Sequence, residues 1–489
     1  MPITQNDEAR VIAAVPKDLF IGGGWRAALR AKRFSVTDPS TGESLCEVGD
    51  AGPDDAKAAL DAAVDAQPQW AMSSPMDRAA ILQKTCELII ERMDDLALLI
   101  TLEMGKPLAD SKAEVTYAAG FFQWFSGEAL RLDGHAMRSA NGSGSITVLK
   151  RPVGPCLLIT PWNFPLAMGA RKIAPAIAGG CVSVVKPAHQ TPLSMLILMT
   201  ILAEAGLPAG VCNLITTSSS GATIDPILHD PQLRKLSFTG STTVGRALAA
   251  AGGKQLLRMS MELGGNAPFI VFEDADIDAA VQGAVTAKMR NMGEACTAAN
   301  RFLVHEAVVD SFTDKLVEKM SDMKVGRGTE DGVTVGSLID DVQRDKVVGF
   351  VGDAVSKGAR VLLGGNAIDG PGSFFEPTVL TDVSNDAHLL KQETFGPVAP
   401  IVTFASDDEA IAMANDTEFG LVAYLYTQDL RRANYVIERL ETGMVGLNQG
   451  VVSSPSAPFG GVKSSGFGRE GGFEGITEYL ETKYIATAY

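Results

Sequence analysis

The chain of 489 residues has six cysteines and five histidines, and their spacing excludes several kinds of site. The cysteines are scattered without a C-x-x-C pair, which argues against a zinc knuckle or a disulfide framework and suits a reducing compartment. The histidines form no H-E-x-x-H motif or similar cluster. The sequence therefore predicts no catalytic metal.

Basic residues are also in deficit, with 42 Lys and Arg against 58 Asp and Glu. The net charge of −16 leaves no basic surface for nucleic acid or an anionic membrane, so neither is expected as a partner. An anionic small substrate is still allowed, because a few arginines inside a pocket can dominate the local field.

Long hydrophobic runs are missing as well. The longest, residues 193–203, contains Ser194 and Thr200 and is too short to span a bilayer. The first ten residues have no basic segment followed by an apolar one, so no secretory signal is expected and the sequence predicts a cytoplasmic protein.

The length and composition are those of a folded protein with about three domains of roughly 150 residues each. Residues 19–26 are a hairpin candidate, and apolar spacing predicts helices over 56–66, 77–103 and 111–130. A Gly/Ser turn at 141–144 precedes a strand candidate at 145–150.

From residue 152 short apolar strands alternate with helices, which predicts a parallel sheet covered on both faces, with ligands beyond the strand carboxyl ends. A second α/β region is expected over 277–469, and the strand-like end 478–489 is suited to pairing with another subunit. The expected strands are 156–160, 181–185, 211–215, 235–238 and 269–272, and the expected helices are 169–178, 194–205, 223–229 and 243–251.

One thiol and one carboxylate are framed by small residues. Cys296 follows Gly-Glu-Ala, and Glu262 precedes Leu-Gly-Gly. This pattern predicts a nucleophile with its own base, against the alternatives of a buried core thiol and a surface carboxylate. For the other five cysteines a role in the core is the preferred interpretation.

Polar residues follow three of the expected strands. Asn163 and Lys186 come after two of them, and Gly240 and Ser241 open a helix after a third, where backbone N–H groups could meet a phosphate. Because this is not a G-x-G-x-x-G motif, the glycine could equally serve only a tight turn. The shared sheet edge makes a nucleotide site the expectation.

Seven segments, in order, resemble those of the aldehyde dehydrogenase superfamily over nearly the whole chain, and the arginine-containing segments are most similar to succinate-semialdehyde dehydrogenases. The resemblance implies an α/β fold with a Rossmann-type cofactor domain (1–134 and 152–262), an α/β catalytic domain (263–470) and a β oligomerisation flap (135–151 and 471–489), in a homodimer or homotetramer. The segments are 160–165, 185–188, 238–241, 262–265, 293–296, 393–397 and 458–463.

The same resemblance assigns roles to the catalytic residues. Cys296 would attack the aldehyde, and the Asn163 amide and the Cys296 backbone N–H would hold the oxyanion. Glu262 would activate the water that hydrolyses the thioester. Glu294 is expected to point away from the thiol, because an inward carboxylate would raise the pKa of the thiol.

The implied cofactor is NADP or NAD. Lys186 and Glu393 resemble the pair that grips ribose hydroxyls, and Phe395 would pack near the nicotinamide ribose. His189 stands where NAD-preferring relatives carry a glutamate that would repel a 2′-phosphate, so NADP is favoured over NAD. The implied cofactor-binding residues are Thr160, Pro161, Trp162, Lys186, Ala188, His189, Gly240, Ser241, Glu393 and Phe395.

The implied substrate is a small carboxylated aldehyde. Arg171, Arg290 and Ser453 match positions that hold a far carboxylate, which two guanidiniums and a hydroxyl suit well, whereas surface ion pairs are the alternative for the arginines. Phe164 and Phe459 would wall the tunnel. The expected reaction is oxidation of succinate semialdehyde to succinate; glutarate or 2-oxoglutarate semialdehyde, a thioester-forming CoA reaction and a non-catalytic binding protein are the alternatives.

Overall fold

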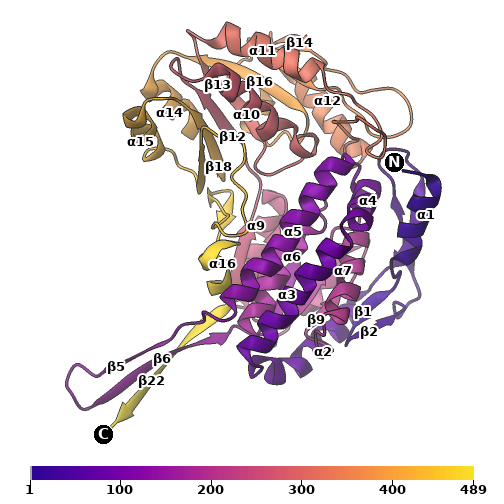
Figure 1. The fold of residues 1–489 in the computed structure, drawn as a ribbon, viewed down its shortest axis with the longest axis vertical. Coiled ribbons are helices and arrows are strands. Elements are labelled where there is room, and N and C mark those ends of the chain that lie inside the picture. The colour runs from indigo at the N-terminus through magenta and orange to yellow at the C-terminus, as the bar shows by residue number, and fades with distance from the viewer. Residues whose placement is uncertain (1–2) are drawn as a thin grey trace.

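The structure is a computed structural model that describes residues 3–489. It confirms the expected α/β architecture, with two large, mostly parallel sheets and a projecting three-stranded arm (Figure 1). No helix within residues 3–489 has both the length and the apolar character needed to cross a membrane.

The first sheet has eight strands in the order β2-β1-β9-β8-β7-β10-β11-β21. Its four central apolar strands are buried, as expected of parallel strands covered on both faces. The strands are β1 (Leu19–Ile21), β2 (Gly24–Arg26), β7 (Cys156–Ile159), β8 (Ser183–Lys186), β9 (Cys212–Leu214), β10 (Lys235–Thr239), β11 (Arg258–Glu262) and β21 (Gly466–Phe467).

The second sheet has seven strands in the order β14-β15-β16-β13-β12-β18-β19. Alternate residues enter different cores: Phe269 and Val271 pack with the cluster around α10 to α12, and Ile270 packs with the cluster around α14 and α15. The strands are β12 (Ala267–Val271), β13 (Ala299–His305), β14 (Arg360–Leu363), β15 (Thr378–Thr381), β16 (Val398–Phe404), β18 (Val422–Tyr426) and β19 (Met444–Leu447).

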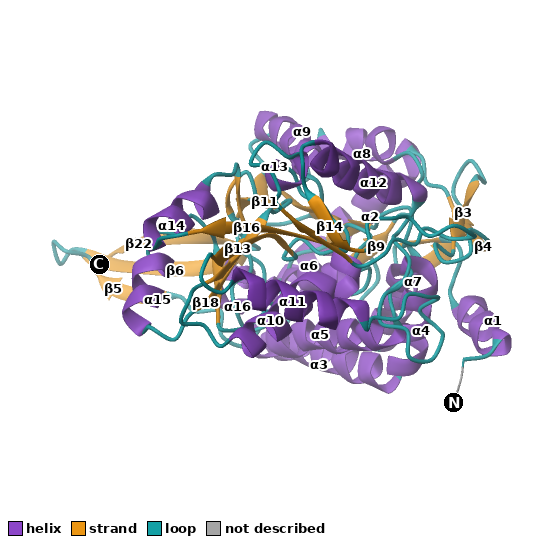
Figure 2. Ribbon diagram, turned by 90° about the horizontal axis from the view of Figure 1, so that it is seen from above, coloured by secondary structure: helices purple, strands orange, loops and turns teal. Residues whose placement is uncertain are grey.

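Helices cover both faces of the strands, with α8 and α9 on one side and α5 and α6 on the other (Figure 2). They are α1 (Gln5–Ala14), α2 (Pro53–Ala71), α3 (Pro75–Glu91), α4 (Met93–Met104), α5 (Leu108–Glu128), α6 (Ala167–Gly179), α7 (Leu193–Glu204), α8 (Ser220–Leu228), α9 (Thr242–Lys254), α10 (Ile277–Met289), η1 (Arg290–Gly293), α11 (Val309–Ser321), α12 (Asp341–Ser356), α13 (His388–Lys391), α14 (Asp407–Asn415), α15 (Leu430–Ile437) and α16 (Gly472–Thr477).

The structure corrects two expectations. The segment 269–272 belongs to the second sheet, because the chain leaves the first sheet after β11, a strand whose mixed polarity hid it in the sequence. The helix expected over 77–103 is two helices, since Arg92 between them has non-helical angles (φ −102°, ψ 20°). The apolar spacing runs across this break because both helices pack against the same core.

The arm consists of β5 (His135–Arg138), β6 (Gly144–Pro152) and β22 (Leu480–Ala488), and β22 pairs with β6 along its whole length (Figure 1). The strand-like chain end is therefore confirmed. Beyond Leu480 every residue of β22 is exposed, including Tyr484 and Ile485. The two short remaining pairs are β3 (Arg33–Thr37) with β4 (Ser44–Gly49), and β17 (Phe419–Gly420) with β20 (Val462–Lys463).

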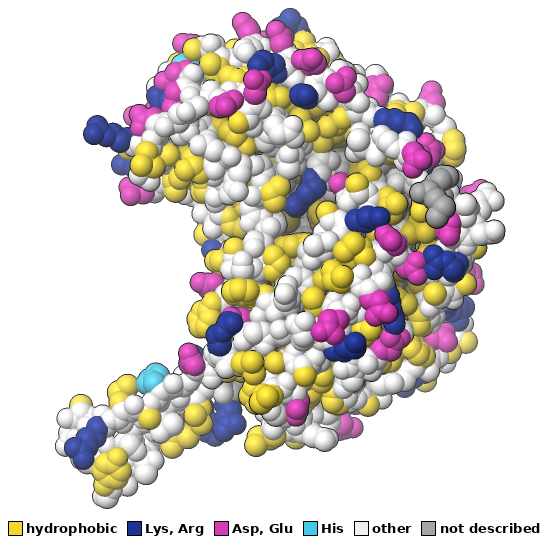
Figure 3. Space-filling view, in the orientation of Figure 1, with side chains coloured by type: hydrophobic (Ala, Val, Ile, Leu, Met, Phe, Trp, Pro, Cys, Tyr) yellow, Lys and Arg dark blue, Asp and Glu magenta, His cyan; other side chains and the backbone are white. Residues whose placement is uncertain are grey.

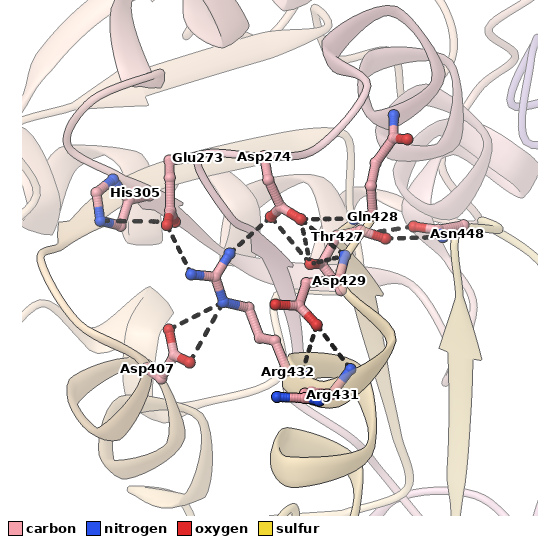
Figure 4. A network of polar contacts seen from close by, with 10 residues as sticks. All are labelled: Glu273, Asp274, His305, Asp407, Thr427, Gln428, Asp429, Arg431, Arg432 and Asn448. Carbon is pink, nitrogen blue, oxygen red and sulfur yellow. Dashed lines mark hydrogen bonds and ion pairs between the residues drawn. The ribbon is translucent and has the colours of Figure 1, made fainter.

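Arg432 on α15 joins the carboxyl end of β12 to the start of α14 (Figure 4). Its guanidinium lies 2.6 Å from Glu273, 2.7 Å from Asp274 and 3.1 Å from Asp407. Asp274 also accepts hydrogen bonds from the backbone N–H groups of Gln428 and Asp429. One largely buried cation thus ties three segments of the second sheet region together.

We expect Arg432→Met to lower the free energy of unfolding by about 1–3 kcal/mol, because three partly buried carboxylates lose their shared cation. The neighbouring Arg431 is exposed and provides the matched control Arg431→Met. Thermal unfolding of both variants measures the difference. Equal midpoints for the two variants would show that the network is not stabilising.

Candidate active site

A cavity of about 700 Å³ opens where the carboxyl ends of the first-sheet strands face the second sheet region. It brings together many of the sequence-predicted residues, and the space-filling view shows the surface hollowed between the two parts of the molecule (Figure 3). Pro161, Trp162, Asn163, Gly240, Ser241, Cys296, Glu393 and Phe395 line it.

A second cavity of about 280 Å³ shares Cys296 with the first. It contains all five predicted substrate residues, although they come from distant parts of the chain. Arg171, Arg290, Ser453, Phe164 and Phe459 line it, together with Tyr117, Met168, Ala295 and Thr297. Cys296 therefore lies at the junction between a large and a small cavity.

The turn that presents Cys296 has an unusual backbone. The three residues Asn291, Met292 and Gly293 all have positive φ values, of 55°, 54° and 78°. A Cβ atom at Gly293 would lie 2.2 Å from the Gly396 carbonyl oxygen, so only glycine fits there. Such strain is characteristic of functional sites, where the surrounding structure holds it.

Asn163 is tied to this turn by backbone carbonyls. Its Nδ2 donates to the Glu294 carbonyl at 2.9 Å, and the Nδ2 of Asn291 donates to the same oxygen at 2.8 Å. The carbonyl of Asn163 in turn accepts from Asn291 Nδ2 at 3.1 Å and from Lys106 Nζ at 2.8 Å. The side chain that the sequence predicts as oxyanion donor is thus held beside Cys296.

Lys106 and Glu114 position this corner, and sequence reasoning missed both. Their side chains are fully buried and form an ion pair at 2.7 Å. Glu114 Oε1 also accepts from the backbone N–H groups of Leu166 at 2.9 Å and Ala167 at 3.1 Å, where α6 begins. In the sequence, the feature that stands out here is the pair Gly105 and Pro107 on either side of Lys106, and it indicates only the end of a helix.

Burial raises the pKa of the Cys296 thiol to about 12, because removal of the thiolate from water outweighs the favourable charges of Arg171 and Arg290. The nearby carboxylates Glu393 and Glu262 act in the same direction as burial. In this state the thiol therefore keeps its proton at neutral pH. The other five cysteines are buried or partly buried.

Glu262, at the end of β11, is buried, and neither of its carboxyl oxygens has a hydrogen-bond partner among residues 3–489. Burial, followed by the neighbouring Glu470, raises its pKa well above the ordinary value. A Cβ atom at Gly460 would lie 2.9 Å from Glu262 Oε1, so the loop backbone closely covers the carboxyl group. Such a group keeps its proton to a higher pH than an ordinary glutamate does.

The side chain of Glu294 is also buried, and its Oε1 accepts from the backbone N–H of Ile339 at 3.1 Å. This contact agrees with the expectation that the carboxylate points away from the thiol. Burial raises the pKa of Glu294 well above the ordinary value.

The two pocket arginines differ in their partners. Arg171 is 1% exposed and pairs with Glu470 at 2.5 Å, with its guanidinium carbon 4.2 Å from the Phe459 ring centroid. Arg290 lies 5.3 Å from the Phe164 ring centroid, and within the described residues no carboxylate lies within ion-pair distance of it. The surface-pair alternative is wrong for Arg171, because Arg171 and its partner Glu470 are both buried.

The expected ribose pair, Lys186 and Glu393, is not joined by a contact. Lys186 Nζ donates to Ser220 Oγ at 3.0 Å, and Glu393 accepts from the Gly265 N–H at 3.1 Å. Burial lowers the pKa of Lys186 to about 8 and raises that of Glu393 to about 7. Thr160 follows β7 and Ala188 lies just beyond β8, and neither residue lines either cavity.

His189 is exposed and lies in a separate cavity, together with Asp340 and Asp341. Burial of part of the ring and the positive charge of Lys186 lower its pKa, so it is neutral at physiological pH. Asp340, which lines the same cavity, acts on the pKa of His189 in the opposite direction to Lys186.

The larger cavity suits a dinucleotide. Ser241 caps α9 and lines the cavity beside Gly240, and the rings of Trp162 and Phe395 meet edge to face at 5.3 Å. Sequence reasoning missed Gln343 and Lys346, whose side chains donate to the carbonyls of Phe395 and Glu393. These contacts fix a loop in which Phe395 has a φ of 56°.

Comparison with known proteins places the chain among enzymes. The profile of the aldehyde dehydrogenase family matches residues 25–485. A succinate-semialdehyde dehydrogenase of Paenarthrobacter nicotinovorans is 54% identical, over 91% of this chain and 99% of that protein. An NADP(+) succinate-semialdehyde dehydrogenase of Escherichia coli and a glutarate-semialdehyde dehydrogenase of Pseudomonas putida are each 48% identical, over 95% of this chain and 96% of theirs.

Solved structures agree with these relatives. The crystal structure of an NADP-dependent enzyme of E. coli is 46% identical and covers 100% of both chains, with a TM-score of 0.96. A betaine aldehyde dehydrogenase of Staphylococcus aureus in complex with NAD+ is 31% identical, covers 99% of this chain and 97% of its own, and has the same TM-score of 0.96.

We expect alkylation of Cys296 by iodoacetamide in the cofactor-free protein to be slow at pH 7 and to accelerate about tenfold per pH unit, because only the thiolate reacts and its pKa is about 12. Mass spectrometry of the Cys296 peptide gives the rate, and a Cys296→Ala variant gives the background from other cysteines. A rate that levels off below pH 8 would contradict the raised pKa.

Proposed function

The chain belongs to the aldehyde dehydrogenase family of NAD(P)-dependent oxidoreductases, and from that premise we propose that it oxidises succinate semialdehyde to succinate. One observation carries this proposal: the small cavity beside Cys296 contains Arg290, a cation without an acidic partner in residues 3–489. A carboxylate at the far end of the aldehyde would supply that partner.

The position of the arginines favours a short substrate. The cavity lies between Cys296 and the arginines, with Phe164 and Phe459 as apolar walls. A four-carbon semialdehyde in an extended conformation has its reacting carbonyl at one end and its carboxylate at the other. Glutarate semialdehyde, with one more methylene, is the alternative, and the name of the P. putida relative supports it.

The chemistry assigned to the residues begins at Cys296. As thiolate it attacks the aldehyde carbon, and the thiohemiacetal oxyanion receives hydrogen bonds from the free N–H of the Asn163 amide and from the Cys296 backbone N–H. Asn163 can do this because only one of its two Nδ2 hydrogens is used by Glu294. The fixed amide then needs no reorganisation during the reaction.

The larger cavity would hold NADP or NAD through Trp162, Ser241, Glu393 and Phe395. When bound, the nicotinamide would accept the hydride that leaves the thiohemiacetal carbon, which leaves a thioester on Cys296. Glu262 then removes a proton from the water that hydrolyses the thioester, which requires the carboxyl group to be ionised. Because burial raises its pKa, this step becomes faster as the pH rises through that pKa.

We infer a preference for NADP from the surroundings of Lys186. Position 189 carries a neutral histidine, and Ser220 offers a hydroxyl next to the Lys186 ammonium. A 2′-phosphate there meets a cation and a donor and no carboxylate at position 189. The E. coli relative, named for NADP(+), agrees with this preference.

We also propose which residues form each functional domain of the chain. Residues 1–134 and 152–262 bind the cofactor, residues 263–470 carry the nucleophile, and 135–151 with 471–489 join copies in a homodimer or homotetramer. The exposed edge strand β22, with Tyr484 and Ile485, supports the last assignment, because an uncovered edge is ready to pair.

We expect Arg290→Met to raise the KM for succinate semialdehyde by about 10- to 100-fold, because a hydrogen bond to a charged group is worth roughly 1.5–3 kcal/mol. The KM for butanal, which has the same chain length and no carboxylate, should not rise. Initial rates measure both, and Arg246→Met, at an exposed ion pair on α9, is the control. Equal losses on both aldehydes would overturn the carboxylate assignment.

We expect His189→Glu to lower kcat/KM for NADP by about tenfold or more and to leave NAD nearly unaffected, since a carboxylate would repel the 2′-phosphate. Initial rates with each coenzyme measure the ratio, and His189→Gln controls for loss of the imidazole. An unchanged ratio in the glutamate variant would place the adenosine ribose away from position 189.

A further inference from the structure

Tyr117, on α5, lines the small cavity and has no role in the family resemblance drawn from the sequence. It shares that cavity with Cys296, Arg171, Arg290 and Ser453. Its hydroxyl oxygen is buried beside the Arg171 guanidinium, and no acceptor for the hydroxyl hydrogen lies within hydrogen-bond distance among residues 3–489. A buried donor without an acceptor costs free energy, so its retention at this place needs a physical reason.

The groups around the hydroxyl explain why it is free to donate. Arg171 and Arg290 are its charged neighbours, and a guanidinium has only N–H donors, so neither can accept the hydroxyl hydrogen. Tyr117 on α5 and Arg171 on α6 therefore both place donors beside the same cavity.

Packing holds the tyrosine ring in place. Its centroid lies 4.7 Å from that of Phe121, one turn later on α5, in an edge-to-face arrangement. At Gly120 a Cβ atom would lie 2.8 Å from Pro455, so glycine lets the loop that carries Ser453 approach α5 closely. The hydroxyl is thus preorganised beside the other three polar groups.

We propose that Tyr117 is a specificity-determining residue whose hydroxyl donates a hydrogen bond to the far carboxylate of the semialdehyde, alongside Arg171, Arg290 and Ser453. This inference rests on the proposed function. Burial raises the pKa of Tyr117, so the phenol keeps its proton and remains a donor throughout the neutral range. A carboxylate with two oxygens has enough lone pairs for the tyrosine hydroxyl and both guanidiniums.

The hydroxyl would discriminate against aldehydes that lack a charged end. An uncharged alkyl group leaves the hydroxyl and the Arg290 charge without an acceptor, whereas a carboxylate satisfies both. Discrimination by unpaired buried donors is stronger than discrimination by the size of an apolar pocket.

The test compares Tyr117→Phe with the unaltered enzyme on succinate semialdehyde and butanal. We expect the KM for succinate semialdehyde to rise about tenfold with little change in kcat, and the KM for butanal to stay the same or fall. Isothermal titration with succinate should show a dissociation constant raised by a similar factor. Tyr479→Phe is the matched control, because its hydroxyl is also buried and lies outside both cavities.

The outcomes separate this inference from the proposed function. If the unaltered enzyme does not prefer succinate semialdehyde over butanal, the proposed function fails. If it does prefer it and Tyr117→Phe keeps the same KM and the same succinate affinity, the tyrosine assignment is overturned. Thermal unfolding shows whether Tyr117→Phe folds, and we expect an unchanged or higher midpoint because an unsatisfied hydroxyl is removed. Equal KM changes in the Tyr479→Phe control would also overturn it.

Discussion

The buried ion pair between Lys106 and Glu114 is the contact on which the geometry of the site depends. Each ion alone would be costly in the core, and each is satisfied by further hydrogen bonds at the same corner of the chain. Lys106 holds the carbonyl of Asn163, while Glu114 holds the first amides of α6, the helix that carries Arg171. The proposed oxyanion donor, Asn163, and a proposed substrate arginine, Arg171, are thereby positioned by one ion pair.

The same device recurs one helix further along the chain. Helices α6 and α7 both begin without a capping side chain of their own. Carboxylates on α5 and α4 accept hydrogen bonds from their first backbone N–H groups instead. Glu103 accepts from the N–H groups of Leu193 and Ser194, as Glu114 does at α6. Anions are favourable at helix N-termini, and these two also fix how α6 and α7 stand against α4 and α5. Burial nevertheless raises the pKa of Glu103 to about 8.

Short-range patterns in the sequence predicted the features that neighbouring residues determine. Apolar runs located the central strands of the first sheet, and small residues around Cys296 marked the turn that presents it. Long-range pairs left no such trace: Lys172 meets Glu470 across 298 residues, Tyr117 looks in the sequence like an ordinary helix residue, and Lys106 lies in a turn between two helices. The family resemblance brought Arg171, Arg290 and Ser453 to attention, yet it could not reveal that Glu470 already neutralises one of the two arginines.

The charge balance of the small cavity follows from that pairing. Arg171 and Lys172 share the single carboxylate of Glu470, and they hold its pKa below the ordinary value in spite of burial. Burial raises the pKa of Glu262 well above the ordinary value and favours its uncharged form, which leaves an excess of cationic groups over carboxylates in this region. A substrate carboxylate removes this excess, but it also screens the arginines that favour the Cys296 thiolate. We therefore expect the oxyanion to be stabilised by groups that the incoming charge does not alter. Uncharged N–H donors, such as those proposed at Asn163 and at the Cys296 backbone, meet that requirement.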